Sequence, residues 1–109
     1  MEKKKMETAL EYTEGTMRRM VTDLARYLKD AKAAVEVARA EYDKAWDAYM
    51  AAESVEALTA AEVAKTIARE KLSYEQGRED AFNTALCSLE SSRKAHAMTI
   101  EELKAGAPF

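Results

Sequence analysis

Residues 21–52 read VTDLARYLKDAKAAVEVARAEYDKAWDAYMAA, and their pattern is the strongest indication of the architecture. Its apolar residues recur at alternating intervals of three and four positions, and it contains neither glycine nor proline. Such a seven-residue repeat is typical of a helix that packs along a second helix, as in a left-handed coiled coil. Two rows of the repeat can be followed: Val21, Leu28, Val35, Tyr42 and Tyr49 in one, and Leu10, Met17, Leu24, Ala31, Ala38, Ala45 and Ala52 in the other.

The composition of the whole chain points the same way. Ala, Glu, Lys, Leu and Arg supply 62 of the 109 residues, a share that indicates long helices when it comes with this periodicity. Alanine alone supplies 22 residues, whereas Val, Ile, Leu and Phe together supply only 17, so the core should be thin. Buried apolar surface contributes about 25 cal/mol per Å². We therefore expect the chain to gain further burial by self-association or from a partner protein.

The expected fold is a single all-α domain over residues 1–109, a long antiparallel helical hairpin. Its first helix should run over about residues 4–52, with a candidate break at Gly15. The second should run over about residues 56–97, with a candidate kink at Gly77 inside a polar stretch.

Capping signals mark the ends of the expected elements. Ser54 lies where a short turn should join the helices and is a good N-cap residue. Thr99-Ile100-Glu101-Glu102 matches a capping box, which predicts a short third helix over residues 99–105. Gly106 and Pro108 should end it. We expect the hairpin to form a helical bundle by self-association.

A short turn makes the two helices antiparallel neighbours, with residue i opposite roughly residue 108 − i. The second helix should then present one apolar stripe to the first. The members of that stripe are Ala60, Val63, Ala64, Ile67, Ala68, Leu72, Tyr74, Ala81, Phe82, Ala85, Leu86 and Leu89.

The sequence offers little for catalysis. Its one histidine, His96, and its one cysteine, Cys87, lie about 13 Å apart along a continuous helix, too far for a nucleophile and its base. Neither a zinc-ligand cluster nor a phosphate-binding glycine loop can be found. The sequence thus predicts a protein that is not an enzyme, with no catalytic residues, metal site or cofactor.

Four residues near the turn form the candidate partner-binding site. Tyr42, Trp46, Tyr49 and Met50 fall on one helix face. Trp and Tyr are enriched at binding hot spots. The same four residues could instead fill the core of an oligomer or of the hairpin's own tip.

A second candidate site lies where the chain ends meet. Arg18 and Arg19 should lie across from Arg93 and Lys94 in the hairpin. Arginine forks suit a phosphate group. An alternative function is therefore an oligomer that sequesters a nucleotide at this basic end.

The leading function is a protein-binding module that inhibits or modulates another macromolecule. An anti-defence protein of a phage or mobile element, similar in role to an anti-CRISPR protein, is one form of it, and a structural coiled-coil adaptor or secretion partner is another alternative. We expect a protein partner, a homodimer or both. With a net charge of −3 and no basic stripe, direct binding of nucleic acid is not expected. A single cysteine and the lack of an apolar leader or membrane span predict a cytoplasmic protein.

Overall fold

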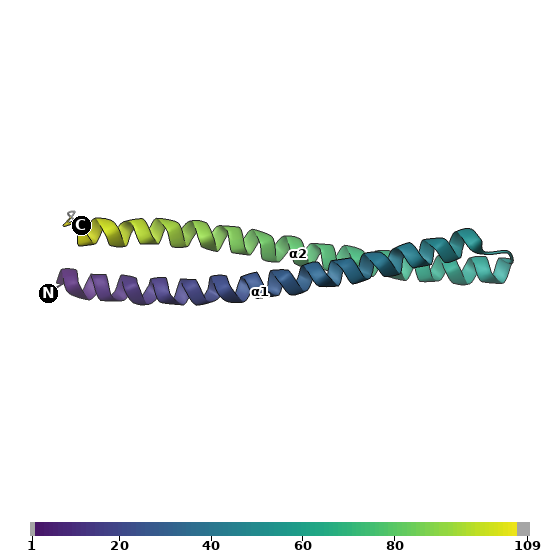
Figure 1. Cartoon of the computed structure of the whole chain (residues 1–109), viewed down its shortest axis with the longest axis horizontal. Coiled ribbons are helices and arrows are strands. Elements are labelled where there is room, and N and C mark those ends of the chain that lie inside the picture. Colours follow the sequence, from purple (N-terminus) through teal and green to yellow (C-terminus); the bar gives the residue numbers. More distant parts are fainter. Residues whose placement is uncertain (1, 107–109) are drawn as a thin grey trace. The chain divides into compact units, whose positions relative to one another are not determined.

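Two long α-helices joined by a short turn make up the computed structural model, which describes residues 2–106. Helix α1 spans Glu2–Ala51 and helix α2 spans Val55–Lys104. The helices run antiparallel and side by side (Figure 1), and ion pairs such as Glu14–Arg93 and Glu41–Lys71 link them. The predicted all-α helical hairpin is confirmed.

Both ends of α2 have local hydrogen bonds that explain where the helix begins and ends. The amide of Ala57 donates to Ser54 Oγ at 3.1 Å, so Ser54 is the N-cap that the sequence predicts. Gly106 has a φ of +86° and its amide donates to the Leu103 carbonyl at 3.1 Å. A left-handed glycine of this kind satisfies a terminal carbonyl and stops a helix. Pro108 lies outside the described residues.

The predicted third helix over residues 99–105 is wrong, because α2 continues without a break to Lys104. Thr99 does not cap anything: its hydroxyl donates back to the Ala95 carbonyl at 3.2 Å, as threonines do inside a helix. Ile100 and Leu103 are buried, so packing carries the helix past the capping signal.

Neither candidate glycine interruption ends a helix. α1 is helical through Gly15 and α2 is helical through Gly77. An added Cβ atom would meet nothing within 4 Å at either position. Both glycines therefore cost helix propensity without relieving any close contact.

The seam of α1 follows the sequence repeat along its described length. Every residue of the two predicted rows is buried or half-buried. The flanking residues Met20, Tyr27 and Trp46 remain exposed. The residues of α1 that pack are thus those of the narrow coiled-coil seam, whereas these three larger side chains beside it stay at the surface.

The apolar stripe predicted for α2 is only partly right. Ala68, Leu72, Phe82, Leu86 and Leu89 are buried or half-buried, whereas other members of the stripe are exposed. The remaining seam positions hold five polar residues as well as the apolar Ala61, Ile100 and Leu103. The full inner row of α2 is Ala61, Lys65, Ala68, Leu72, Glu75, Glu79, Phe82, Leu86, Leu89, Arg93, His96, Ile100 and Leu103.

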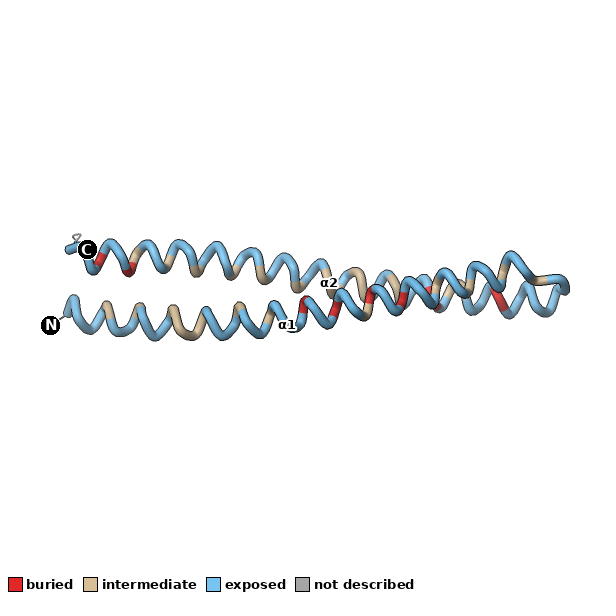
Figure 2. The backbone as a smooth tube through the Cα atoms, viewed as in Figure 1, coloured by how far each residue is buried: buried red, intermediate tan, exposed pale blue. Residues whose placement is uncertain are grey.

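Contacts divide the hairpin into two compact units, whose buried residues are red in Figure 2. The tip unit is Tyr27–Ala81, and the terminal unit comprises the described residues up to Arg26 and from Phe82 onward. Only two residues of the terminal unit are buried, Ile100 and Leu103. In the tip unit the buried residues are Leu28, Ala31, Val35, Ala38, Ala61 and Ala68.

Candidate functional site

Three of the four predicted partner-binding residues form one aromatic cluster in the tip unit. The Trp46 ring meets Tyr42 edge to face with 6.5 Å between ring centroids, and it meets Tyr49 in the same way at 5.6 Å. Edge-to-face pairs of this kind are a favoured aromatic geometry. The cluster follows from the sequence, because residues four and three apart share a helix face.

Lys65 of α2 completes this cluster from the other helix. Its Nζ atom lies 4.1 Å from the Trp46 ring centroid and 4.0 Å from that of Tyr49, and 3.1 Å from Glu62 Oε2. A cation over an aromatic face is attracted by the ring quadrupole. Lysine stands at a seam position that an apolar residue usually fills, and the sequence pattern gave no reason to expect it there.

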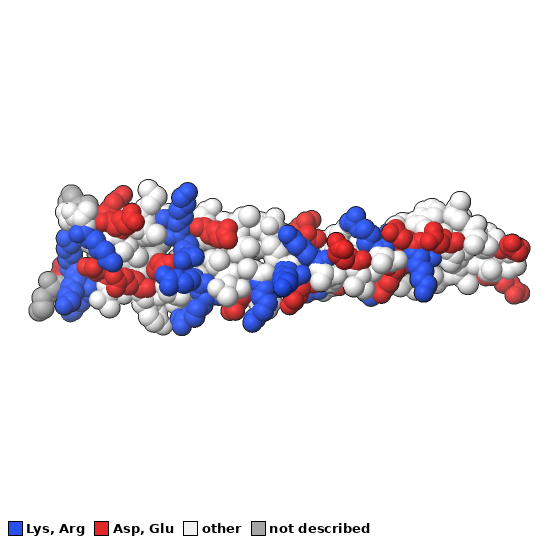
Figure 3. Space-filling model, in the orientation of Figure 1, with Lys and Arg blue, Asp and Glu red and all other residues white. Residues whose placement is uncertain are grey.

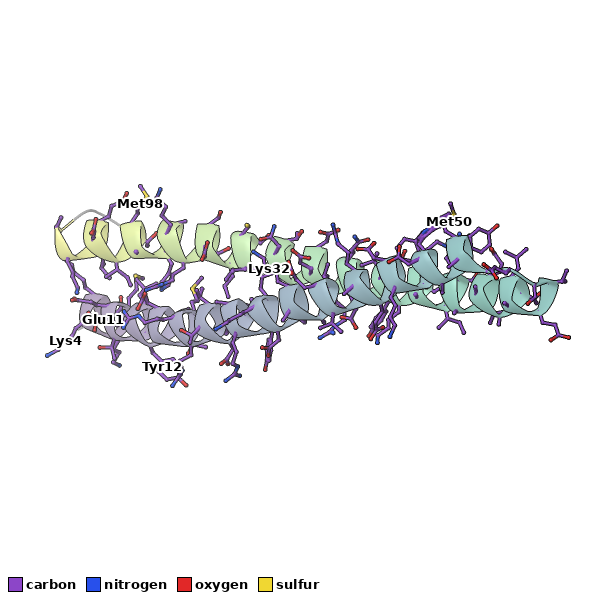
Figure 4. The ribbon with its side chains drawn as sticks, turned by 45° about the vertical axis from the view of Figure 1, so that its right-hand side comes forward. Lys4, Glu11, Tyr12, Lys32, Met50 and Met98 are labelled. Atoms are coloured by element: carbon purple, nitrogen blue, oxygen red, sulfur yellow. The ribbon has the colours of Figure 1, made fainter. Side chains whose placement is uncertain are left out.

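The outer edge of the cluster is open to solvent. Trp46 is 38 % exposed and Met50 is 74 % exposed, and Met50 points away from α2 (Figure 4). Val55 and Leu58, at the start of α2, are exposed as well. We call these four residues the Trp46 patch. Its tryptophan is fixed by its neighbours and yet still available to a partner.

At the predicted basic end, a carboxylate already occupies the space between the arginines. Glu14 Oε2 accepts a hydrogen bond from Arg18 Nη2 at 2.7 Å, and Glu14 Oε1 accepts one from Arg93 Nε at 2.9 Å. The sequence correctly placed Arg18 and Arg93 near one another. It missed Glu14, whose two carboxylate oxygens each accept from one of the guanidinium groups that would otherwise bind a phosphate.

The other members of the basic site do not converge on this point. Arg19 Nη2 lies 3.4 Å from Thr16 Oγ1 on its own helix, and Lys94 is exposed. His96 lies on the seam, where Nε2 is 2.7 Å from the Leu10 carbonyl oxygen of α1. Its ring links the two helices.

Two ionisable groups of the terminal unit are shifted by their ion pairs. The hydrogen bond from Arg93, helped by Arg18, lowers the pKa of Glu14 against a partial desolvation that would raise it. The hydrogen bond to Glu11 raises the pKa of Lys104, whose Nζ atom lies 3.0 Å from Glu11 Oε1. Both shifts favour the charged forms, so these contacts are ionic at neutral pH.

Charges of both signs are mixed on the face of the molecule that Figure 3 shows. Acidic and basic side chains alternate on the face seen in Figure 3, with no broad region of one sign. Within residues 2–106, no group of three or more His, Cys, Asp or Glu side chains could hold a metal ion. No helix in this part of the chain is long and apolar enough to cross a membrane.

The tip unit also has an open apolar groove that was not predicted from the sequence. It has a volume of about 450 Å³ and lies between α1 and α2. The Glu41–Lys71 ion pair, with 3.1 Å between Lys71 Nζ and Glu41 Oε2, borders it. Small side chains on both helices create the space. The apolar lining consists of Ala45, Ala48, Ala64, Ile67 and Ala68.

The described residues therefore define an all-α helical hairpin with an aromatic patch on one side of its tip unit and an alanine groove on the other. Comparison of the chain with models of protein families, with curated proteins and with solved structures finds no match.

Proposed function

We propose that this chain is a non-enzymatic protein-binding module that docks another protein through the Trp46 patch. The observation that supports it is the state of Trp46, which is held between two tyrosines and Lys65 while more than a third of its surface stays exposed. Binding hot spots are enriched in tryptophan and tyrosine. An anchor that is already ordered loses little side-chain entropy when a partner covers it.

The charge of the tip unit suggests what the partner surface offers. Tyr27–Ala81 contains 8 basic and 12 acidic residues, a net charge of −4. The complementary surface is an apolar pocket with a basic rim. Rim charges act mainly on the association rate and its salt dependence. Binding through the patch should therefore weaken as salt is raised.

Inhibition or modulation of the bound macromolecule is the form of this function that we favour. An anti-defence role of the anti-CRISPR kind is one example and stays a prediction. The same proposal includes self-association into a helical bundle. Its support is the number of large apolar side chains of the tip unit that one chain leaves exposed, such as Val37, Val63 and Ile67.

Site-specific photo-crosslinking tests the proposal. A photoreactive phenylalanine analogue replaces Met50 in cells that naturally make the protein, and a matched control carries it at Tyr12, which is equally exposed at 74 % and points away from α2 (Figure 4). The expected result is one defined heterologous adduct from position 50. Trp46→Ala should abolish that adduct while far-UV circular dichroism shows the helices intact.

Three outcomes would overturn the assignment of the patch. They are the absence of a defined adduct from position 50, the same adducts from position 12, and an adduct that Trp46→Ala leaves unchanged in a folded protein. An adduct at twice the 12.2 kDa chain mass would instead assign the Trp46 patch to self-association.

A further inference from the structure

Helix α2 carries a second seven-residue row that the hairpin itself does not bury. Val63, Ile67 and Tyr74 belong to this outer row and are 54 %, 61 % and 66 % exposed. With Ala60 before them, their spacings are three, four and seven residues, which fit a helix seam whose one intervening position is the charged Glu70. Within the tip unit, α2 therefore has an inner row against α1 and an outer row that faces solvent.

The outer row borders the alanine groove, and Ile67 belongs to both. On one surface, a protruding side chain thus stands beside a space lined by Ala45, Ala48, Ala64 and Ala68. A two-fold symmetric contact uses the same patch on both copies, so that patch must offer both the protrusion and the space that receives it. This surface offers both.

The exposed area of one chain is large enough for such a contact. The chain exposes 8000 Å², whereas a compact folded chain of 12.2 kDa is expected to expose about 6000 Å². A standard interface removes about 800 Å² from each partner. The excess exceeds that requirement about twofold.

We propose that a second copy of this chain covers the outer row, with the two α2 helices antiparallel and the two-fold axis at Ile67. The inference rests on the self-association put forward above and specifies its surface and register.

The register about Ile67 pairs a small residue with a large one and an acid with a base, and it sets Val63 of one copy opposite Lys71 of the other. Ala60 lies seven residues before Ile67 and Tyr74 lies seven after it, so the small residue of one copy meets the large residue of the other. Glu56 and Arg78 lie eleven residues away on either side, and that distance is close to three helical turns. The Glu56 carboxylate of one copy thus faces the Arg78 guanidinium of the other, which already donates to Glu75 Oε2 at 2.7 Å.

This contact leaves the Trp46 patch accessible. Trp46 and Ala48 are two residues apart on α1, which turns their side chains about 200° from one another. The patch and the groove consequently lie on opposite flanks of the tip unit. A dimer of this kind presents two copies of the Trp46 patch, and a partner with repeated sites would be bound with enhanced avidity.

The first experiment measures mass against concentration by sedimentation equilibrium. The wild-type protein is expected at twice 12.2 kDa at high concentration. Ile67→Glu should raise the dimer dissociation constant by more than about tenfold, the loss typical of a hot-spot residue. Met98→Glu, a matched control on α2 at 56 % exposure, should leave the constant unchanged.

The second experiment tests the register in a Cys87→Ser background, since Cys87 is an exposed free thiol. With a short bismaleimide, Ile67→Cys should cross-link to itself. Tyr74→Cys alone should not, but it should cross-link to Ala60→Cys when the two proteins are mixed.

The outcomes separate the two proposals. A wild-type protein that stays monomeric at every concentration overturns both self-association and this inference. A dimer that Ile67→Glu does not weaken, or that cross-links as readily through Met98→Cys as through Ile67→Cys, overturns the inference alone.

Discussion

The tip unit and the terminal unit use different means to hold the same two helices together. In the tip unit, Ala31 and Ala38 are fully or almost fully buried, and the cross-helix ion pair Glu41–Lys71 joins two exposed side chains. In the terminal unit, larger residues such as Met17 and Phe82 are only half-buried, and the helices are linked by Glu14–Arg93, Glu11–Lys104 and the His96 ring.

The difference follows from side-chain size. An alanine on one helix lets the other helix approach closely. The close approach excludes water, although each alanine contributes little buried apolar area. Larger side chains keep the backbones further apart, and long charged side chains can then bridge the space. Burial is insensitive to salt and pH, whereas exposed ion pairs are screened and titrated. The two units should therefore respond to different perturbations.

Removing a large buried side chain from the tip unit should have the largest effect. Leu28→Ala is expected to lower the free energy of unfolding by about 2–5 kcal/mol, because it removes apolar surface and leaves a cavity. Leu58→Ala makes the same chemical change at an exposed position and should cost far less. Urea denaturation measures both. Equal losses would mean that the seam is not the main source of stability.

Enlarging an alanine tests close approach directly. Ala31 is 0 % exposed, so Ala31→Leu should cost about 1–3 kcal/mol through overpacking. Ala33→Leu lies two residues away on the exposed surface and should be nearly neutral. A neutral Ala31→Leu would show that the helices can separate at the tip at no cost, which would remove the contrast between the units.

The α1 half of the fold was predictable because one clean repeat occupies that helix. Helix α2 carries two apolar rows that are offset by one residue. The stripe predicted for α2 combined members of both rows. Ala68 and Leu72 belong to the inner row, whereas Val63 and Ile67 belong to the outer one. Period alone does not say which row meets α1. Only the register of the partner helix decides that.

For the candidate sites, local spacing was enough to group Tyr42, Trp46 and Tyr49, because a helix brings such residues together. The cross-helix partners Lys65 and Glu14 could not be found that way. Each lies at a seam position where the seven-residue repeat predicts an apolar residue. Each is accommodated by a contact from the opposite helix.

Replacing each helical glycine by alanine should raise the stability of the hairpin, by less than the losses expected at Leu28 and Ala31. The two glycines lie in different units, so the two variants can be compared. Gly77→Ala in the tip unit and Gly15→Ala in the terminal unit should each stabilise by about 0.5–1 kcal/mol, since alanine favours the helix and open space lies beside both positions. Thermal unfolding measures the gain. A loss of stability at either position would mean that the backbone there needs the freedom of glycine.

Neutralising Glu14 should have the smallest effect on stability. The way in which this effect changes with pH tests whether the Glu14 carboxylate is its source. Because the arginines lower the pKa of Glu14 in the folded chain, the carboxylate contributes stability above its ordinary pKa of 4.5. That contribution is lost as pH falls through the folded-state pKa. Glu14→Gln should therefore lower the melting temperature at pH 7, with a difference from wild type that shrinks as pH drops below 4.5 or as salt is added.

Hydrogen exchange locates this loss. Glu14→Gln should speed amide exchange in the terminal unit, around Leu10 and His96, and leave amides near Val35 unchanged. Exchange that rises equally in both units would mean that the hairpin opens as one cooperative body. The ion pairs of the terminal unit would then stabilise the alanine seam as well. The two units would still pack by different means, but they would unfold together.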